Sequence, residues 1–485
     1  MRKLVATFLF ASFVFCVYGQ SQDDLPSDFL GKEFHQQRRQ ALREKLPINS
    51  VAVFFANAVR NRSNDVDYIY HQDPNFYYLT GYNEPDAVLL VFKDMHTANN
   101  GTQYDEILFV QPRDVQAEMW NGRRLGYEGV RTTLGLSQAF DNTDFDKYNV
   151  DFSKFDVVLF TDFQNDVRDN PLDSADLYSL IEQFKEKVNY PSKETLNVAR
   201  EAQVNNLNTK QLPLIMGTLR GRKTPEELTL LRKAVSISCM AQREVMKAIK
   251  PGMSEREIQG IHEFVFKKYQ AEHTGYPSIV GAGHNGCILH YIENYKPNVS
   301  NTELILIDLG AEYHGYTADI TRTIPISGKF SPEQWAIYDL VLKAQEEAMK
   351  ACKPGITTQE LSVITHRVIN RGLTELGIIK SETEQHTYYP HGCCHHIGLD
   401  VHDPMPGGKL EENMVITIEP GIYIPEDAKC DKRWWGIAVR IEDDYLITKD
   451  GFELLSTAAP RKAEEIEALM KEPSALDDFE LPAIK

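Results

Sequence analysis

Four carboxylates occur at sequence positions where side chains are expected to be buried. Asp308 and Glu419 each end an apolar run, while Asp319 and Glu442 each lie within a run typical of a strand. A charge buried in such a strand costs several kcal/mol unless it is paired or binds a metal. One such residue alone is best explained as a structural carboxylate. Four of them, delivered by separate strands, predict a shared cationic partner.

Residues 391–403 add a dense group of histidines to these carboxylates: His391, His395, His396 and His402. A turn at Gly315 would form a hairpin that brings Asp308 and Asp319 together. Carboxylates that converge raise one another's pKa unless cations neutralise them. Two divalent metal ions, with histidine as an additional ligand, would do so. We expect His396 to be a core or surface residue instead.

The second half of the chain contains an internal duplication that would position these groups. Long amphipathic helices are expected to begin at the Ser/Thr-Pro-Glu sequences 224–226 and 331–333 and to end at Pro-Gly. A hydroxyl N-cap followed by proline favours such starts. The repeats are offset by 107 residues at the starts and 103 at the ends, and a second helix is expected after each Pro-Gly. Ser/Thr-Pro-Glu is a common helix start, so coincidence is the alternative. The matching ends favour a domain with pseudo-twofold symmetry.

The first half alternates short apolar runs with helical patterns. Buried strands are expected at 51–55, 87–92, 107–110 and 157–160, and helices around 32–46 and 174–188. This pattern predicts a small α/β domain with a mostly parallel or mixed sheet. The polar segment 205–212 is the expected linker.

Charge and composition exclude some classes of function. The 485 residues include 52 basic and 70 acidic side chains, for a net charge of −18. Nucleic-acid binding needs clustered basic residues, so the balance argues against it. A content of 42% hydrophobic and 25% charged residues is typical of a soluble globular protein. The length suggests two or three domains, and the duplication reduces the expectation to two.

Residues 1–19 predict a cleavable secretory signal. A basic start precedes the apolar run 4–18, and Gly19 offers a small residue before a polar stretch. The apolar run is short for a membrane span. We therefore expect an exported protein, periplasmic or extracellular, with no stable membrane insertion after cleavage. An uncleaved interfacial anchor is the alternative. Loss of Arg2 and Lys3 would change the net charge from −18 to −20.

Six cysteines follow the signal: Cys239, Cys287, Cys352, Cys393, Cys394 and Cys430. Six in a chain of this length do not form a disulfide scaffold. We expect most of them to be buried thiols, although one disulfide could form in an oxidising compartment. The adjacent Cys393 and Cys394 are not expected to pair easily.

The spaced Asp–Asp–His–Glu–Glu set resembles the pita-bread metallopeptidases, and within them aminopeptidase P. Runs similar to that family occur in both halves of the chain, at 76–85, 120–126, 286–291, 391–392, 398–403 and 440–444. The resemblance covers nearly the whole mature chain. It implies a mixed α/β and α+β fold class: a small α/β N-terminal domain over 20–212, then a pseudo-twofold duplicated pita-bread catalytic domain over 213–485.

The resemblance also implies a ligand set for two divalent ions: Asp308, Asp319, His395, Glu419 and Glu442. Asp319 and Glu442 would bridge the ions, Asp308 would chelate one, and His395 and Glu419 would complete the other. Four oxygen donors and one imidazole favour Mn²⁺ over Zn²⁺ or Co²⁺. The ions would lower the pKa of a bridging water and supply a hydroxide nucleophile.

The implied activity is release of the N-terminal residue from peptides with proline in the second position. Glu419 would pass a proton to the leaving proline nitrogen, and His402 and His290 would stabilise the oxyanion. Four residues would form the substrate side: His391, Arg440, Tyr276 and Tyr423. The chain departs from the family pattern at Cys393-Cys394 and His396, which would alter metal affinity or redox sensitivity without removing a ligand.

Three alternatives remain open. A prolidase would use the same ligands and cleave only Xaa-Pro dipeptides. A metal-free creatinase-like hydrolase and a non-catalytic peptide-binding protein share the fold, but both predict the loss of ligands that are all present here. The family resemblance also implies a homodimer or homotetramer. Trp120 is a candidate for a contact between subunits, with local packing as the alternative.

Overall fold

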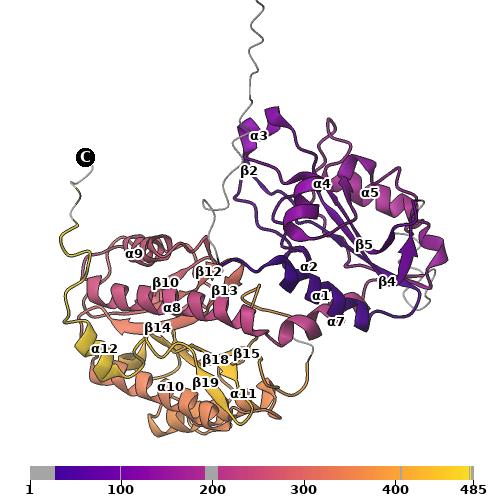
Figure 1. Cartoon of the computed structure of the whole chain (residues 1–485). Helices are drawn as coiled ribbons and strands as arrows, with labels where there is room; N and C mark the ends of the chain where they lie inside the picture. Colours follow the sequence, from indigo (N-terminus) through magenta and orange to yellow (C-terminus); the bar gives the residue numbers. More distant parts are fainter. Residues whose placement is uncertain (1–27, 99, 192–205, 405–406, 480, 482–485) are drawn as a thin grey trace, which may run out of the picture.

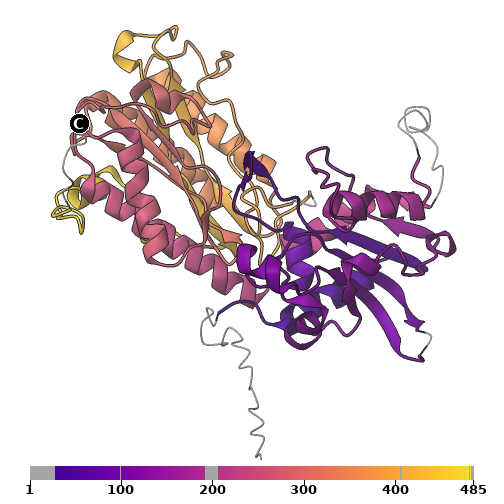
Figure 2. The same cartoon turned by 90° about the horizontal axis from the view of Figure 1, so that it is seen from above.

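The computed structural model describes residues 28–98, 100–191, 206–404, 407–479 and 481. An N-terminal part, coloured indigo to magenta, lies beside a larger C-terminal part, coloured pink to yellow (Figure 1). The view from above shows the same division (Figure 2). The predicted signal peptide, residues 1–19, lies outside the described residues. Within the described part of the chain, no helix is both long and apolar enough to cross a bilayer.

A six-stranded mixed sheet forms the centre of the N-terminal part, in the order β6-β5-β4-β1-β7-β8. Strand β4 pairs antiparallel with β1 and β5, and the other neighbours are parallel. The strands are β1 (Ser50–Phe55), β4 (Val88–Thr97), β5 (Gln103–Val110), β6 (Ala139–Asp141), β7 (Val157–Leu159) and β8 (Leu207–Asn208). The four predicted strands are thus confirmed, in a mixed sheet.

Helices and one small hairpin surround this sheet. The helices are α1 (Lys32–Lys45), α2 (Pro74–Thr80), α3 (Val115–Asn121), α4 (Gly126–Gly129) and α5 (Leu177–Lys187), and the hairpin pairs β2 (Asn61–Ser63) with β3 (Val66–Asp67). Helices α1 and α5 match the two predicted helices closely. Valine, leucine and phenylalanine on both faces of the sheet are buried, because helices or loops cover each face.

The described part of the segment predicted as a linker, residues 206–212, instead includes a strand and the start of a helix. Leu207–Asn208 forms β8, which pairs in parallel with β7, and α7 (Gln211–Gly221) begins before the segment ends. The predicted boundary between residues 212 and 213 therefore falls inside α7, which packs against α1. A two-residue edge strand is fixed by its partner rather than by its own sequence pattern, so the polar residues gave no sign of it.

Two helix pairs related by the repeat pack against the C-terminal sheets. They are α8 (Pro225–Ala248) with α9 (Glu255–Lys268), and α10 (Pro332–Ala351) with α11 (Thr358–Glu375). Each of the four helices begins with a complete capping box, at Thr224, Ser254, Ser331 and Thr357. The predicted duplicated architecture is confirmed. Helix α12 (Ala463–Leu469) follows near the C-terminus and contacts α8 and α10.

The strands of this part form small antiparallel sheets between the helix pairs. They are β9 (His273–Thr274), β10 (Ile279–Ala282), β11 (Leu304–Leu309), β12 (Ala311–Tyr313), β13 (Tyr316–Thr317), β14 (Ile320–Pro325), β15 (Val415–Ile418), β16 (Gly421–Ile424), β17 (Ile437–Arg440), β18 (Asp443–Ile447) and β19 (Phe452–Leu454). Helix α8 packs on β12, β13 and β14, and α10 packs on β15, β16 and β17. The two halves of the repeat thus present their strands to a common centre.

Two runs that the sequence suggests are continuous strands are interrupted at a carboxylate. Asp319 lies between β13 and β14, and Glu442 lies between β17 and β18. At the second break the chain changes partners, because β17 pairs with β16 whereas β18 pairs with β15. The residue types favour strand throughout, so only the change of partners reveals the break. At each break, the carboxylate side chain does not have to follow the alternation of side chains along a strand.

Candidate metal centre

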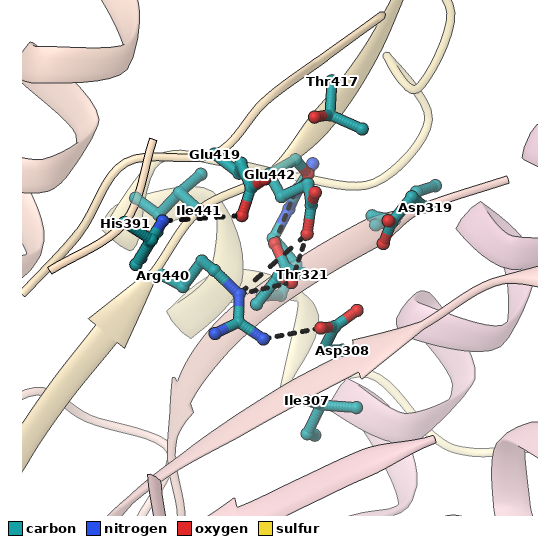
Figure 3. Close-up of polar contacts among 12 residues, drawn as sticks. Ile307, Asp308, Asp319, Thr321, His391, Thr417, Glu419, Arg440, Ile441 and Glu442 are labelled. Carbon is teal, nitrogen blue, oxygen red and sulfur yellow. Dashed lines mark hydrogen bonds and ion pairs between the residues drawn. The ribbon is translucent and has the colours of Figure 1, made fainter. Parts of the chain in front are cut away.

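Each half of the repeat delivers two of the four carboxylates to one place. Asp308 lies in β11 opposite Thr321 of β14, and Asp319 lies just before β14. The predicted hairpin is present, and its turn uses the left-handed backbone of His314 (φ 50°) and Gly315 (φ 85°). Figure 3 shows the side chains of Asp308, Asp319 and Glu442 extending toward a shared space.

Two buried glutamines fix the strands that carry these carboxylates. The Gln242 side-chain amide on α8 donates to the carbonyl oxygens of Ile307 and Ile320, at 3.0 and 2.9 Å. Gln345 on α10 donates to the carbonyls of Ile418 and Ile441, at 3.0 and 3.3 Å. Each of these carbonyls belongs to the residue next to a carboxylate of the site.

The glutamines are related by the repeat, since each lies nine residues before the proline of a Pro-Gly helix end. Sequence reasoning missed them, although this shared position was available as a signal. A buried amide that bonds two strands constrains both of them, because breaking either bond would leave a buried carbonyl unpaired.

A cavity of about 490 Å³ contains the site. All five predicted metal ligands line it, together with most of the predicted catalytic and substrate residues: His290, His391, His402, Arg440 and Tyr276. Tyr423 is buried behind this wall, and its hydroxyl bonds two lining residues, His391 at 2.8 Å and Arg440 at 3.1 Å. The structure therefore brings every predicted site residue into one constellation.

His395 turns one ring nitrogen toward three of the carboxylates. Its Nδ1 lies 3.1 Å from the carbonyl oxygen of His396, which favours a proton on Nδ1 and leaves the lone pair of Nε2 free. That Nε2 lies 3.4 Å from Asp319, 3.5 Å from Glu419 and 3.8 Å from Glu442. Ligand atoms about 2.1 Å from a common ion are separated by such distances.

Three of the carboxyl groups have strongly perturbed acidity. Burial, and then the neighbouring carboxylates, raise the pKa of Asp319, Glu419 and Glu442 well above the ordinary range. In this arrangement the groups favour protons, which a divalent cation would replace. Donor atoms of Asp319, His395 and Glu442 all lie within 4.8 Å of one another. The donor chemistry and geometry fit divalent metal ions.

Arg440 and Thr321 order the remaining side of the constellation. Arg440 Nη2 lies 2.5 Å from Asp308 Oδ2, and its Nε donates to the Thr321 hydroxyl at 3.1 Å. The same hydroxyl donates to Glu442 Oε2 at 2.6 Å (Figure 3). Thr321 thus couples Glu442 to Arg440, which itself binds Asp308 of the other half of the repeat. The sequence analysis did not assign this role to Thr321.

Tyr276 lies deeper than its predicted place near the substrate suggests. Its hydroxyl is 2.6 Å from a carboxylate oxygen of both Asp308 and Asp319. Burial, followed by the charges of these aspartates, raises the pKa of Tyr276 well above its ordinary value, so the hydroxyl remains a donor. Tyr276 therefore contacts the predicted metal ligands directly.

Two of the histidines that line the cavity, His391 and His402, have a lowered pKa. Burial, with Arg440 nearby, lowers the pKa of His391 to about 4. Burial, with His395 and His290 nearby, also lowers the pKa of His402, whose ring packs edge-on against His395 at 4.5 Å. A neutral imidazole can donate a hydrogen bond to a developing negative charge.

His396 is a core residue, as expected. Its side chain is buried, and burial lowers its pKa to about 4. It bridges to Ile416 of β15 through the backbone and turns away from the carboxylates that His395 faces. Two consecutive histidines thus alternate between the site and the core, as a strand requires.

A buried ion cluster anchors the loop that carries His402. Arg220 at the end of α7 pairs with Asp403 and Asp400, at 2.5 and 2.7 Å, and Lys223 pairs with Asp403 at 2.7 Å. Arg220 also donates to Asn75 of the N-terminal part at 2.9 Å. The two parts of the chain are therefore joined directly behind the histidine loop.

Comparisons with known proteins agree with this geometry. Residues 229–449 match the model of metallopeptidase family M24, and residues 35–155 match that of the aminopeptidase P N-terminal domain. The chain is 37% identical over 458 residues to an Xaa-Pro aminopeptidase of Escherichia coli, covering 92% of this chain and 98% of the relative. It is 30% identical over 436 residues to human Xaa-Pro aminopeptidase 3, covering 88% and 82%.

Solved structures give the same result. Aminopeptidase P from E. coli, determined with the inhibitor Pro-Leu, superposes with a TM-score of 0.79 at 35% identity and covers 91% of this chain and 98% of its own. Proline aminopeptidase P II from Yersinia pestis matches with the same TM-score and identity, over 91% and 99%. The chain therefore belongs to metallopeptidase family M24, in its aminopeptidase P branch.

Proposed function

We propose that this metallopeptidase removes the N-terminal residue from peptides that carry proline in the second position. The observation that supports this function best is the convergence of five donor side chains in one cavity, whose other walls carry three histidines and Arg440. The similarity to Xaa-Pro aminopeptidases over nearly the whole chain supports the same substrate class.

Five side chains would hold two divalent ions: Asp308, Asp319, His395, Glu419 and Glu442. Ions bound there activate water and polarise the scissile carbonyl. Carboxylate-rich donor sets suit Mn²⁺, which we propose ahead of Zn²⁺ and Co²⁺. The protein's own groups supply the proton transfers and the positioning.

Glu419 would carry the proton that the reaction moves. Its carboxylate lies 3.5 Å from His395 Nε2 and 3.8 Å from His391 Nδ1, and Glu419 lines the cavity. Glu419 would accept a proton from the attacking water and donate it to the proline nitrogen, because its carboxylate lies among the side chains that would hold the ions. His402 and His290 face the same cavity and would donate to the oxyanion.

Preference for proline would follow from the chemistry of its amide. The Xaa-Pro bond lacks an N–H, so a site that recognises it cannot depend on that donor. His391 and Arg440, held by the Tyr423 hydroxyl, form a rigid wall suited to the ring. A fixed ring in a fixed pocket loses little conformational entropy on binding.

Peptide length separates this function from that of a prolidase. We expect an Xaa-Pro-Xaa tripeptide such as Ala-Pro-Ala to be cleaved with a kcat/KM at least about tenfold above that of Ala-Pro, which corresponds to about 1.4 kcal/mol. The measurement is release of free alanine with Mn²⁺ present, and Ala-Ala-Ala is the control for proline dependence. Cleavage restricted to the dipeptide would establish the prolidase alternative.

We also propose that the chain forms a homodimer or homotetramer through helix α3. Val115, Met119 and Trp120 on this helix are 82%, 79% and 87% exposed. Large apolar side chains gathered at one exposed site are typical of protein contacts. Trp120→Ala is expected to shift the sedimentation coefficient toward that of a monomer. Tyr178→Ala, a change at another partly exposed aromatic residue, serves as the matched control; equal sedimentation of wild type and Trp120→Ala would contradict this interface.

We further propose that the protein is exported and acts in the periplasm or outside the cell. The basic start and the apolar run of residues 4–18 support this location. N-terminal sequencing of the mature protein tests it, with a first residue near Gln20 as the expected result. A mature protein that retains residues 1–19 would contradict signal cleavage.

A further inference from the structure

Two adjacent thiols directly precede His395. The sulfur atoms of Cys393 and Cys394 are 3.0 Å apart, and both cysteines are free. Cys393 is fully buried, whereas Cys394 lines the cavity that holds the carboxylates. A disulfide bond measures about 2.05 Å, so the sulfurs need to approach by only about 1 Å to join. A small molecule that enters the cavity would reach Cys394 first.

The backbone that carries these thiols is fastened on both sides to the strand that delivers Glu419. The Glu419 N–H donates to the Cys393 carbonyl at 2.8 Å, and the Thr417 N–H donates to the His395 carbonyl at 2.9 Å. The His395 N–H in turn donates to the Thr417 hydroxyl at 3.2 Å. A change of conformation at the step from 393 to 394 therefore acts directly on His395 and Glu419.

A disulfide between neighbouring residues is necessarily strained. Adjacent Cα atoms are about 3.8 Å apart, whereas disulfides prefer about 4.4 to 6.8 Å. This mismatch is why adjacent cysteines are not expected to pair easily, and it also makes such a bond easy to reduce. Strained, accessible disulfides are typically the labile and regulatory ones.

We propose that Cys393 and Cys394 form a redox-modification site, at which a reversible vicinal disulfide displaces His395 and Glu419 and so lowers peptidase activity. The predicted loss of activity rests on the proposed function, whereas formation of the disulfide does not. The co-reactant is a small disulfide, RSSR, of the glutathione type. Ser362 on α11 supports the buried thiol, since its hydroxyl accepts from the Cys393 N–H at 3.1 Å and lies 3.6 Å from the Cys393 sulfur.

The exchange proceeds in two balanced steps. The Cys394 sulfur attacks RSSR, forming a mixed disulfide while one RS group leaves and takes up the thiol proton as RSH. The Cys393 sulfur then attacks the Cys394 sulfur, the Cys393–Cys394 bond forms, and the second RSH leaves. Two thiols and one RSSR thus yield one ring disulfide and two RSH, and a dithiol reductant reverses the sequence.

Incubation of the metal-loaded enzyme with oxidised glutathione tests the proposal. We expect the intact mass to fall by two hydrogen atoms, with the bond mapped to the peptide that holds both cysteines. The kcat/KM should fall about tenfold or more, since disturbance of groups that orient metal ligands typically costs 10- to 100-fold. Dithiothreitol should restore both the mass and the activity.

Cys393→Ser and Cys394→Ser each remove one of the two thiols that form the disulfide. The kcat/KM of each variant is measured before and after treatment with oxidised glutathione. In Cys394→Ser, which lacks the thiol that reacts first, we expect less than about a twofold change in kcat/KM. Cys393→Ser retains that thiol and should stop at the mixed disulfide, so its intact mass should rise by one RS group and no internal disulfide should form. Cys430→Ser, a matched control at a partly buried cysteine that does not line the cavity, should respond as wild type does. An equal loss of activity in Cys394→Ser, or a bond mapped to Cys352, would overturn the proposal. Peptide mapping requires no turnover, so the disulfide is tested even if the proposed substrate is wrong.

Discussion

Replacing Glu419 with glutamine is expected to lower kcat for an Xaa-Pro-Xaa tripeptide by about 10³-fold while the fold is retained. Loss of a positioned general acid–base group alone typically costs 10²- to 10⁴-fold. Glutamine has nearly the same shape and leaves the backbone bond from residue 419 to the Cys393 carbonyl intact. The measurement is steady-state turnover with saturating metal, accompanied by circular dichroism and metal analysis.

Metal analysis shows which function of Glu419 is lost. If Glu419→Gln retains both ions but loses turnover, the result supports a role of Glu419 in proton transfer. If the variant lacks an ion, the loss of activity is explained by the role of Glu419 as a metal ligand. Glu412→Gln is the matched control, because Glu412 is an exposed glutamate in the turn before β15 and does not line the cavity. It should retain wild-type activity. A near-normal rate for Glu419→Gln would refute the proposed proton shuttle.

Removal of divalent metal is expected to abolish activity and to lower the unfolding temperature by several degrees. Without cations the carboxylates of Asp308, Asp319, Glu419 and Glu442 are confined in one cavity with mutual repulsion. A bound ligand present at 100 times its Kd contributes about 2.7 kcal/mol, which is lost on chelation. Calorimetry after dialysis against EDTA measures the change.

Addition of Mn²⁺ should restore both the unfolding temperature and turnover. Recovery with Zn²⁺ or Co²⁺ that exceeds recovery with Mn²⁺ would revise the choice of metal. Activity that persists after EDTA dialysis, with metal analysis showing no bound ion, would exclude the metal-dependent mechanism and favour the creatinase-like alternative.

The stabilisation by metal should also decrease as the pH falls. Burial and neighbouring carboxylates raise the folded-state pKa of Asp319, Glu419 and Glu442. Each group therefore destabilises the metal-free fold above the ordinary carboxyl pKa of about 4, and this penalty grows with pH until the raised pKa is reached. Metal binds the ionised form. The difference in unfolding temperature between metal-bound and metal-free protein should therefore be larger at pH 8 than at pH 6.

Most of the fold could be predicted because its signals are local. The helix starts at Thr224 and Ser331 have hydroxyl N-caps followed by proline, and the structure confirms them as capping boxes. The four apolar runs of the N-terminal half form strands because both faces of that sheet are covered. Strand β8 was missed, since the two residues Leu207–Asn208 form a strand only through pairing with β7.

The sequence by itself determined the residues that could bind metal. Buried carboxylates demand a partner, so Asp308, Asp319, Glu419 and Glu442 could be identified from the apolar character of their surroundings and from the histidines of 391–403. The duplication, too, follows from spacing alone.

Only the tertiary structure decided how these groups are oriented and what supports them. The strand breaks at Asp319 and Glu442 arise from changes of sheet partner, and Gln242 and Gln345 act on residues at least 65 positions away in the chain. The 3.0 Å separation of the Cys393 and Cys394 sulfurs is likewise visible only in the folded structure. Contacts between distant segments depend on packing, and the local sequence pattern does not encode them.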